Sequence, residues 1–233
     1  MNCPRLRAVI FDFNGVIADD EATHFLAFQQ ALAEEGLVLT QDQYYGTYLG
    51  MDERQCTEAL LVSVTGENDP GRVDRIGKRK AALFRTRTAS SRPPLFPGVV
   101  EFVKGAGERC RLAIATGGRR EQIEYALRGT PIEHSFSALV SAEDVWIGKP
   151  DPAIYRLALE MINKQAPPPH PLIQPAECLV IEDSLAGIRA ALNAGMKVVA
   201  VTTTYPPHEL APAHLVLQSL ERASVDSLES CLK

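Results

Sequence analysis

The sequence predicts an α/β fold, a doubly wound parallel sheet with an all-helical cap domain inserted into it. Continuous apolar runs of strand length recur along the chain, as in strands that are buried on both faces of a sheet. Helical segments separate most of these runs, which is typical of parallel strands joined by helical crossovers. Residues 18–92 break this alternation, because they show helical periodicity only.

Six strands and four helices account for the predicted core. The strands are residues 6–13, 112–116, 139–140, 179–182, 197–202 and 215–217. The helices are residues 99–105, 119–128, 152–163 and 186–194. Gly195 directly follows the last helix, and glycine commonly ends helices. Residues 164–176 are rich in proline and predict a surface loop.

The predicted insertion contains four helical segments, residues 25–35, 41–48, 53–64 and 73–88. A Ser-Ser-Arg-Pro-Pro stretch at residues 90–94 closes it. We therefore expect two domains: a core domain formed by residues 1–17 and 93–233, and a cap domain formed by residues 18–92. The insertion leaves the core directly beside the end of the first strand, where a lid over a site belongs.

Composition excludes several classes of protein. The chain has 24 Lys and Arg against 29 Asp and Glu, a formal charge of −5, and no basic stripe, so nucleic acid is not an expected partner. No apolar stretch approaches the ~18 residues that a membrane span needs, and no signal peptide precedes the first strand. The five cysteines are scattered without metal-site spacing, which predicts reduced thiols and a cytoplasmic protein. No pattern indicates an oligomeric state.

Polar side chains follow several predicted strands at the point where each strand ends. In a doubly wound sheet these positions lie together at one edge, where ligands bind. The residues so collected are Asp12, Asn14, Thr116, Lys149, Glu182 and Asp183. Several carboxylates repel one another unless a cation lies among them, and oxygen ligands suit Mg²⁺. A lysine and a hydroxyl opposite that cation suit a phosphate group.

The spacing of these residues agrees with the inferred domains. Lys149 lies 33 positions after Thr116, and Asp183 lies 34 positions after Lys149. Each interval is about one strand–helix–strand unit of ~30 residues. Asp12 and Thr116 are 104 positions apart, and the excess of about 70 matches the helical insertion.

Four segments in this order resemble the four motifs of the haloacid dehalogenase superfamily. They are Asp12-Phe13-Asn14-Gly15-Val16, Ala115-Thr116-Gly117, Gly148-Lys149-Pro150 and Glu182-Asp183-Ser184-Leu185-Ala186-Gly187-Ile188. The insertion resembles a C1-type cap, as in the beta-phosphoglucomutase and phosphoglycolate phosphatase branch. The resemblance covers nearly the whole chain, and it implies a Rossmann-like core.

The resemblance also implies roles for the residues of the motifs. Asp12 is then the nucleophile that forms an aspartyl-phosphate, a covalent step that splits one hard transfer into two easier ones. Mg²⁺ is held by Asp12, the backbone carbonyl of Asn14 and Asp183, with Glu182 close by. Thr116 and Gly117 contact the phosphate, and Lys149 pairs with the phosphate and with Asp12.

Asn14 departs from the superfamily pattern, which has an acid/base aspartate at this position. An asparagine keeps its carbonyl and can donate a hydrogen bond, but it cannot transfer a proton. General acid–base catalysis contributes about 10²–10⁴-fold, so we expect slow turnover of ordinary phosphate esters. Four interpretations are open: an introduced change, a native residue in an enzyme that needs no leaving-group protonation, a phosphate binder without catalysis, and deamidation at Asn14-Gly15.

Three cap residues are candidate substrate contacts. The resemblance aligns His24 and Lys80 with a hinge histidine and a cap lysine of the mutase branch, and Arg54 with a phosphate-binding arginine one position away. Solvated helix charges are the competing interpretation for Arg54 and Lys80. The expected function is a Mg²⁺-dependent phosphatase acting on a small phosphorylated metabolite. A sugar-phosphate mutase and a catalytically silent metabolite-binding protein are the alternatives.

Overall fold

The protein, seen here as a computed structural model, is described over residues 5–49, 51, 53–89 and 92–232. The described residues form a six-stranded sheet in which all paired neighbours are parallel, in the order β3-β2-β1-β4-β5-β6. The strands are β1 (Ala8–Phe11), β2 (Arg111–Ala115), β3 (Ala138–Val140), β4 (Cys178–Glu182), β5 (Lys197–Val201) and β6 (Leu215–Leu217). The predicted fold class is confirmed.

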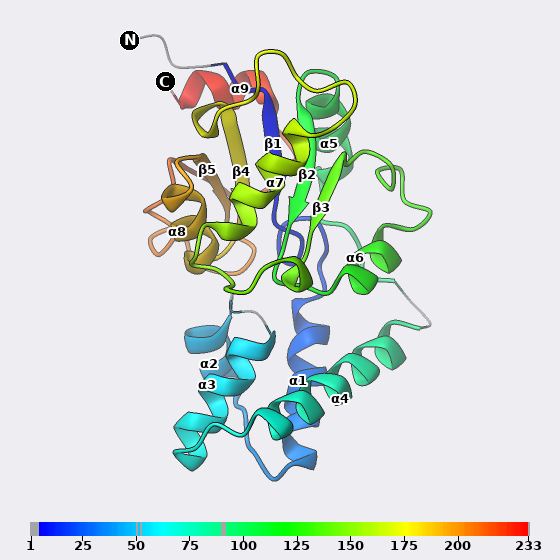
Figure 1. Cartoon of the computed structure of the whole chain (residues 1–233), viewed down its shortest axis with the longest axis vertical. Helices are drawn as coiled ribbons and strands as arrows, with labels where there is room; N and C mark the ends of the chain where they lie inside the picture. The colour runs from blue at the N-terminus through cyan, green and yellow to red at the C-terminus, as the bar shows by residue number, and fades with distance from the viewer. Residues whose placement is uncertain (1–4, 50, 52, 90–91, 233) are drawn as a thin grey trace.

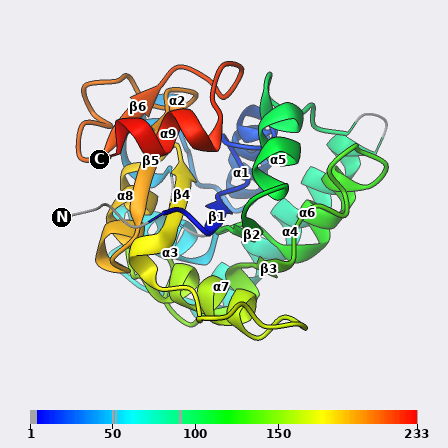
Figure 2. The same cartoon turned by 90° about the horizontal axis from the view of Figure 1, so that it is seen from above.

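Helices cover both faces of this sheet (Figures 1 and 2). One face carries α7 (Ala153–Asn163) and α8 (Leu185–Asn193). The other carries α5 (Val99–Gly107), α6 (Arg120–Leu127) and α9 (Val225–Cys231). The sequence predicted all of these helices except α9. This helix has a capping box at Ser224, but its seven residues are too few to show a clear helical periodicity.

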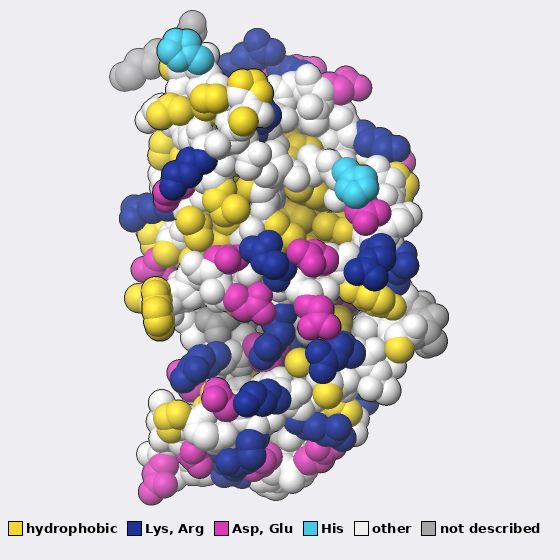
Figure 3. All heavy atoms as spheres, turned by 45° about the vertical axis from the view of Figure 1, so that its right-hand side comes forward, with side chains coloured by type: hydrophobic (Ala, Val, Ile, Leu, Met, Phe, Trp, Pro, Cys, Tyr) yellow, Lys and Arg dark blue, Asp and Glu magenta, His cyan; other side chains and the backbone are white. Residues whose placement is uncertain are grey.

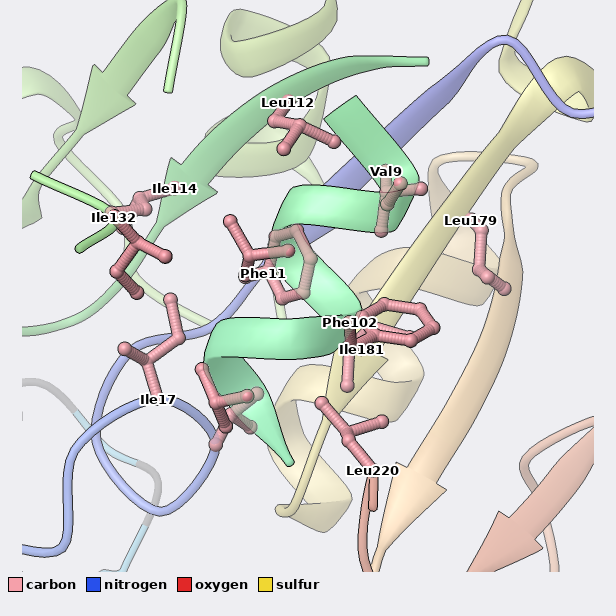
Figure 4. Packing of buried hydrophobic residues seen from close by; sticks show 14 of the residues in the cluster. Val9, Phe11, Ile17, Phe102, Leu112, Ile114, Ile132, Leu179, Ile181 and Leu220 are labelled. Carbon is pink, nitrogen blue, oxygen red and sulfur yellow. The ribbon is translucent and has the colours of Figure 1, made fainter. Parts of the chain in front are cut away.

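Alternate residues of each strand supply the two halves of the core. On β1, Val9 and Phe11 face α5 and α9, whereas Ala8 and Ile10 face α7 and α8. Phe11 and Phe102 pack edge to face with ring centroids 5.9 Å apart (Figure 4). Because both faces are buried, the charged residues of the strands lie only at strand ends: Arg111 and Lys197 begin β2 and β5, and Glu182 ends β4.

Four helices and a π-helical turn form the inserted segment below the sheet (Figure 1). They are α1 (Glu21–Glu34), α2 (Gln41–Gln43), the turn Tyr44–Tyr48, α3 (Glu53–Thr65) and α4 (Pro70–Thr88). These helices bury a separate apolar cluster that includes Phe28, Leu32 and Leu60. Ala18 bridges to Leu95, so the two connections to the core run side by side. The expected domain boundaries at residues 18 and 92 stay a prediction.

Charges on the surface of the inserted helices are mixed in sign. Arg79 pairs with Glu34, and both Arg72 and Arg75 pair with Glu35. Figure 3 shows basic and acidic side chains intermingled over the lower part of one face of the molecule. None of the described helices is long and apolar enough to cross a membrane.

Candidate active site

The carboxyl ends of the strands face the inserted helices and form one wall of a cavity (Figure 1). Asp12 directly follows β1, Thr116 follows β2, Lys149 lies in the loop after β3, and Asp183 follows β4. The cavity has about 780 Å³ of space including its open mouth. All four side chains line it and are buried. Parallel strands thus place residues more than 100 positions apart at one site.

Asp12 and Lys149 form a buried ion pair. The Lys149 Nζ lies 3.0 Å from Asp12 Oδ1 and 2.5 Å from Glu182 Oε1. Burial raises the pKa of Asp12 to about 6, although Lys149 acts against this shift. Burial by itself would lower the pKa of Lys149, but the charges of Asp12 and Glu182 outweigh it and raise the pKa. Lys149 therefore stays protonated and partly neutralises the nucleophile that the motif predicts.

Glu182 is fully buried, and both of its carboxylate oxygens are occupied by donors. Oε1 accepts from Lys149 and from the Tyr155 hydroxyl at 2.6 Å. Oε2 accepts from the Asp183 and Ser184 backbone N–H groups and from the Ser184 hydroxyl, each at 3.0 Å. Gly187 is required behind it, because a Cβ there would lie 1.7 Å from Oε1. In this arrangement Glu182 holds Lys149 in place.

Asp183 is held against the loop that follows β1. The Thr204 hydroxyl donates to Asp183 Oδ2. A Cβ at Gly15 would lie 2.0 Å from the same oxygen, and Gly15 has a φ of +75°. Burial raises the pKa of Asp183 well above its usual value, and the charges of Glu182 and Asp12 add to this effect. Only glycine satisfies both the backbone angle and the close approach at position 15.

The acidic cluster fits a divalent cation. Asp12, Glu182 and Asp183 each offer an oxygen, and these atoms lie within 4.8 Å of one another. Three carboxylates and one lysine leave two uncompensated negative charges if all are ionised, which is unfavourable in a buried site without a cation. Hard oxygen donors suit Mg²⁺. Asp12 and Asp183 line the cavity and are the carboxylates of this cluster that could hold the ion, whereas a role for the Asn14 carbonyl stays a prediction.

Thr116 and the glycines after it border the same space. The Thr116 hydroxyl accepts from the Gly118 N–H at 3.1 Å and lies 3.4 Å from Asn14 Oδ1. A Cβ at Gly118 would lie 3.0 Å from Asn14 Oδ1. Thr116, Gly117 and Gly118 all line the cavity, so a phosphate oxygen in it can meet a hydroxyl and backbone donors.

Polar contacts connect Asn14 to the inserted helices. The Asn14 amide donates to both oxygens of Asp20, at 2.8 and 2.9 Å. Lys80 lies between His24 and Glu53, with its Nζ 2.8 Å from His24 Nδ1 and 2.8 Å from Glu53 Oε2. Glu53 also accepts from Arg119 of the core at 3.1 Å. The inserted helices are therefore linked to the core at two places, by the contact of Asp20 with Asn14 and by the contact of Glu53 with Arg119.

The far side of the cavity is formed by the inserted helices and is partly apolar. Its described lining there includes Phe28, Tyr44, Tyr48, Leu49, Met51 and Cys56. Glu21 adds a carboxylate that accepts a 2.5 Å hydrogen bond from the Tyr44 hydroxyl. Burial raises the pKa of Glu21. The organic part of a phosphate ester in this cavity would therefore contact aromatic side chains and hydrogen-bonding groups.

The structure brings most of the predicted site residues to this cavity. His24, Lys80, Thr116, Gly117 and Asn14 line it with the acids and Lys149. Arg54 does not: its side chain is 62% exposed and pairs with Glu58 at 2.9 Å, so the structure gives no support to its role as a substrate contact. Glu182 lies behind Lys149 rather than in the described lining. The roles of all these residues stay predictions.

Several residues that contact the site were not predicted from the sequence. Thr203 donates to the Gly15 carbonyl at 2.5 Å, and Thr204 donates to Asp183. Both follow β5, so the rule that selected the other strand ends could have selected them. Tyr155 and Asp20 come from a helix and from the start of the insertion, and no pattern in the sequence marks them.

The fold and this site define a class of protein, the α/β enzymes with a helical cap over a carboxylate-rich site. The chain belongs to the haloacid dehalogenase-like hydrolases, because the model of that family matches residues 6–195. The resemblance found in the four motifs is thereby confirmed, and the chain is an enzyme.

Relatives cover most of the chain. It is 33% identical over 196 residues to the phosphorylated carbohydrates phosphatase of Thermotoga maritima, covering 82% of this chain and 83% of that protein. It is 31% identical over 212 residues to protein CbbY of Rhodobacter capsulatus, covering 86% and 87%. A crystal structure of a CbbY mutant from Rhodobacter sphaeroides in complex with xylulose-(1,5)bisphosphate has a TM-score of 0.82, 27% identity, and coverage of 96% and 99%.

Proposed function

We propose that this protein is a Mg²⁺-dependent phosphatase that hydrolyses a small phosphorylated metabolite through an aspartyl-phosphate on Asp12. The observation that carries the proposal is the buried group formed by Asp12, Lys149 and Asp183 in the wall of the cavity. A carboxylate without a cation would repel a phosphate dianion. Lys149, whose Nζ lies 3.0 Å from Asp12 Oδ1, lessens that repulsion, and a Mg²⁺ ion held by Asp12 and Asp183 would supply further positive charge.

In the first step a carboxylate oxygen of Asp12 attacks phosphorus, and the bond from phosphorus to the leaving oxygen breaks. Lys149 and the Thr116 hydroxyl hydrogen-bond the oxygens of the transferred group. When bound, the metal neutralises phosphate charge and orients the phosphate toward the nucleophile. Glu182 contributes by fixing the Lys149 ammonium at 2.5 Å.

In the second step a water oxygen attacks phosphorus, and the bond from phosphorus to Asp12 breaks. The proton that this water loses cannot go to Asn14, because an amide has no basic site at neutral pH, so it passes to solvent or to an oxygen of the phosphoryl group. The leaving oxygen of the first step likewise receives no proton from Asn14, so it departs as an alkoxide or phenoxide anion and takes its proton from solvent. We therefore expect phosphate esters of weakly basic alcohols to react faster than alkyl phosphates, by about 10²–10⁴-fold in kcat/KM.

The substrate class is supported by the cap side of the cavity and by the relatives. Glu21 and the hydroxyl of Tyr48 can bond hydroxyl groups, and Phe28 and Met51 can pack against a carbon skeleton. The Thermotoga maritima relative is named for phosphorylated carbohydrates, and the Rhodobacter sphaeroides protein was crystallised with a sugar bisphosphate. A phosphorylated sugar or polyol is therefore the substrate that we propose to test first.

The test measures release of inorganic phosphate from p-nitrophenyl phosphate, acetyl phosphate and a hexose monophosphate with and without MgCl₂. We expect Mg²⁺-dependent turnover of the first two compounds, and Asp12→Asn should reduce kcat by roughly 10⁴-fold or more. The matched control is Asp42→Asn, which makes the same change at an exposed position of α2. Unchanged turnover in Asp12→Asn would refute the nucleophile. A requirement for an added bisphosphate would favour the mutase alternative.

A further inference from the structure

Asp20 is a buried carboxylate that accepts hydrogen bonds from the Asn14 amide and lies beside the His24 ring. Its side chain lies at the start of α1 and the residue is 3% exposed. The Asn14 amide nitrogen lies 2.8 Å from Oδ1 and 2.9 Å from Oδ2. The His24 Nε2 lies 3.4 Å from Oδ2. Asp20 therefore stands between the loop after β1 and the first helix of the cap.

His24 lies between Lys80 of the inserted helices and the contact of Asn14 with Asp20. Lys80 Nζ lies 2.8 Å from His24 Nδ1 and forms an ion pair with Glu53. On the other side of the ring, Nε2 lies 3.1 Å from the Asn14 amide nitrogen and 3.4 Å from Asp20 Oδ2. The Asn14 amide donates to both oxygens of Asp20, so Asp20 is the carboxylate that accepts from this amide.

His24 is fixed in this orientation by packing. Its ring stacks on Phe84 of α4 with centroids 4.1 Å apart and an interplanar angle of 27°. The residue is 7% exposed and lines the cavity beside Asn14. Stacking and the contact with Lys80 hold the His24 ring beside position 14. The shorter contacts of the Asn14 amide are those with the two Asp20 oxygens, so Asp20 is its principal acceptor.

We infer that Asn14 and Asp20 are a matched donor–acceptor pair, and that Asp20 is a positioning residue that sets Asn14 and His24 at the cap side of the cavity. A carboxylate at position 14 would lie within 3 Å of the Asp20 carboxylate, where two negative charges repel strongly. The amide at position 14 satisfies the acid at position 20 directly, whereas a carboxyl group there would have to hold a proton to avoid the repulsion. A change introduced only to block catalysis would not bring with it a buried acceptor for the new amide.

The test exchanges the two groups. Asn14→Asp alone places two carboxylates together, and we expect its Tm to fall by about 5 °C or more. Asp20→Asn alone leaves the Asn14 amide without its charged acceptor, and we expect a loss of similar size. In the double variant Asn14→Asp/Asp20→Asn, an amide again faces a carboxylate, and Tm should recover at least half of the summed losses. Asn193→Asp and Asp42→Asn make the same chemical changes at exposed positions and should leave Tm nearly unchanged.

Activity separates positioning from a purely structural role. With p-nitrophenyl phosphate, Asp20→Asn should lower kcat by about tenfold or more, because a small displacement at a site costs rate, with a smaller change in KM. The double variant is compared by Tm alone, because Asn14→Asp also introduces a carboxyl group at the acid/base position and can raise kcat for that reason. Additive losses of Tm in the double variant would overturn the pair. A kcat of Asp20→Asn within twofold of that of the unaltered protein would overturn the positioning role. The Tm comparison needs no turnover, so it decides the pair even if the proposed phosphatase activity fails.

Discussion

At the scale of single residues, Glu182 of the fourth motif has contacts that favour a role in positioning Lys149 over a role as a metal ligand. Sequence alone places it among possible metal ligands, next to Asp183. In the fold its two oxygens accept from Lys149, Tyr155, Ser184 and two backbone N–H groups. Burial would raise the pKa of Glu182, but Lys149 outweighs it and lowers the pKa. The carboxylate is fully used in positioning Lys149.

Glu182→Gln tests this assignment. A glutamine has the same shape, but its NH₂ group would face a donor at either end of the carboxamide. We expect the free energy of unfolding to fall by about 3 kcal/mol, and Tm by roughly 6–12 °C, because one buried polar group is left unsatisfied. Thermal and urea unfolding without metal measure the change. Glu160→Gln, at an exposed position of α7, is the control. A loss of Mg²⁺ affinity without loss of stability would instead make Glu182 a ligand.

At the scale of elements, the loop after β1 has to pass very close to the carboxyl end of β4. Strands β1 and β4 are neighbours, with Phe11 beside Ile181. The residues that follow them, Asp12 to Gly15 and Asp183, are consequently forced together. Gly15 with a φ of +75° turns the chain at this point and leaves room for Asp183 Oδ2. The glycine of the first motif is thus explained by the strand order.

Gly15→Ala should therefore lower the stability of the fold by more than the unfavourable backbone angle alone would. A non-glycine residue in the left-handed region costs about 1–2 kcal/mol. Gly36 has a φ of +74°, and a Cβ added there would meet nothing within 4 Å, so Gly36→Ala measures that cost alone, an expected Tm loss of about 2–8 °C. Gly15→Ala should lose more Tm than this and should weaken Mg²⁺ binding, measured by calorimetric titration, because Asp183 is displaced. Equal losses in the two variants would mean that the close approach is unimportant.

At the scale of the whole molecule, the site lies where the sheet and the inserted helices, each with its own apolar cluster, meet through charged side chains. Asp12, Glu182 and Asp183 come from the sheet edge, whereas His24, Lys80 and Glu53 come from the inserted helices. Burial would raise the pKa of Glu53, but Lys80 and Arg119 outweigh it and lower the pKa, so this link is ionic at neutral pH. Without metal, the excess negative charge beside Asp12 opposes the stability of the folded state.

The dependence of stability on pH and Mg²⁺ follows from these charges. The pKa of Asp12 is raised from 3.8 to about 6 and that of Asp183 is raised as well, so the folded state holds their protons more tightly than the unfolded state. Their contribution to stability is therefore greatest below pH about 4 and is lost as pH rises through about 6. In EDTA, we expect Tm to decrease between pH 5 and 7.

Mg²⁺ should reverse this decrease, because it binds the ionised carboxylates. At a concentration of about 100 times Kd, it should add about 2.7 kcal/mol, or roughly 5–10 °C in Tm at pH 7. Differential scanning fluorimetry over a pH series measures both effects. Asp183→Asn should remove most of the response to Mg²⁺, whereas the surface variant Asp42→Asn should keep it. A Tm insensitive to Mg²⁺ at pH 7 in the unaltered protein would refute the metal site.

The sheet, all of its described covering helices except α9, and the edge at which chemistry is expected could be predicted from the sequence. Buried parallel strands read as continuous apolar runs, and their carboxyl ends must meet at one edge, so Asp12, Thr116, Lys149 and Asp183 could be grouped before any coordinates. The position of the insertion followed from the same spacing. These features depend on local pattern and on topology, which a sequence carries directly.

The partner of each polar side chain, in contrast, was set by the tertiary structure. Side-chain hydrogen bonds depend on orientation and on distances of a few tenths of an ångström between elements that are far apart in the chain. For that reason neither the bond from Tyr155 to Glu182 nor the one from Thr204 to Asp183 could be assigned from the sequence. Arg54 lies one position from the aligned arginine of the family pattern and turns out to face solvent. The Asn14 amide, an isolated departure in the sequence, donates to Asp20 in a partly buried contact that the start of α1 provides.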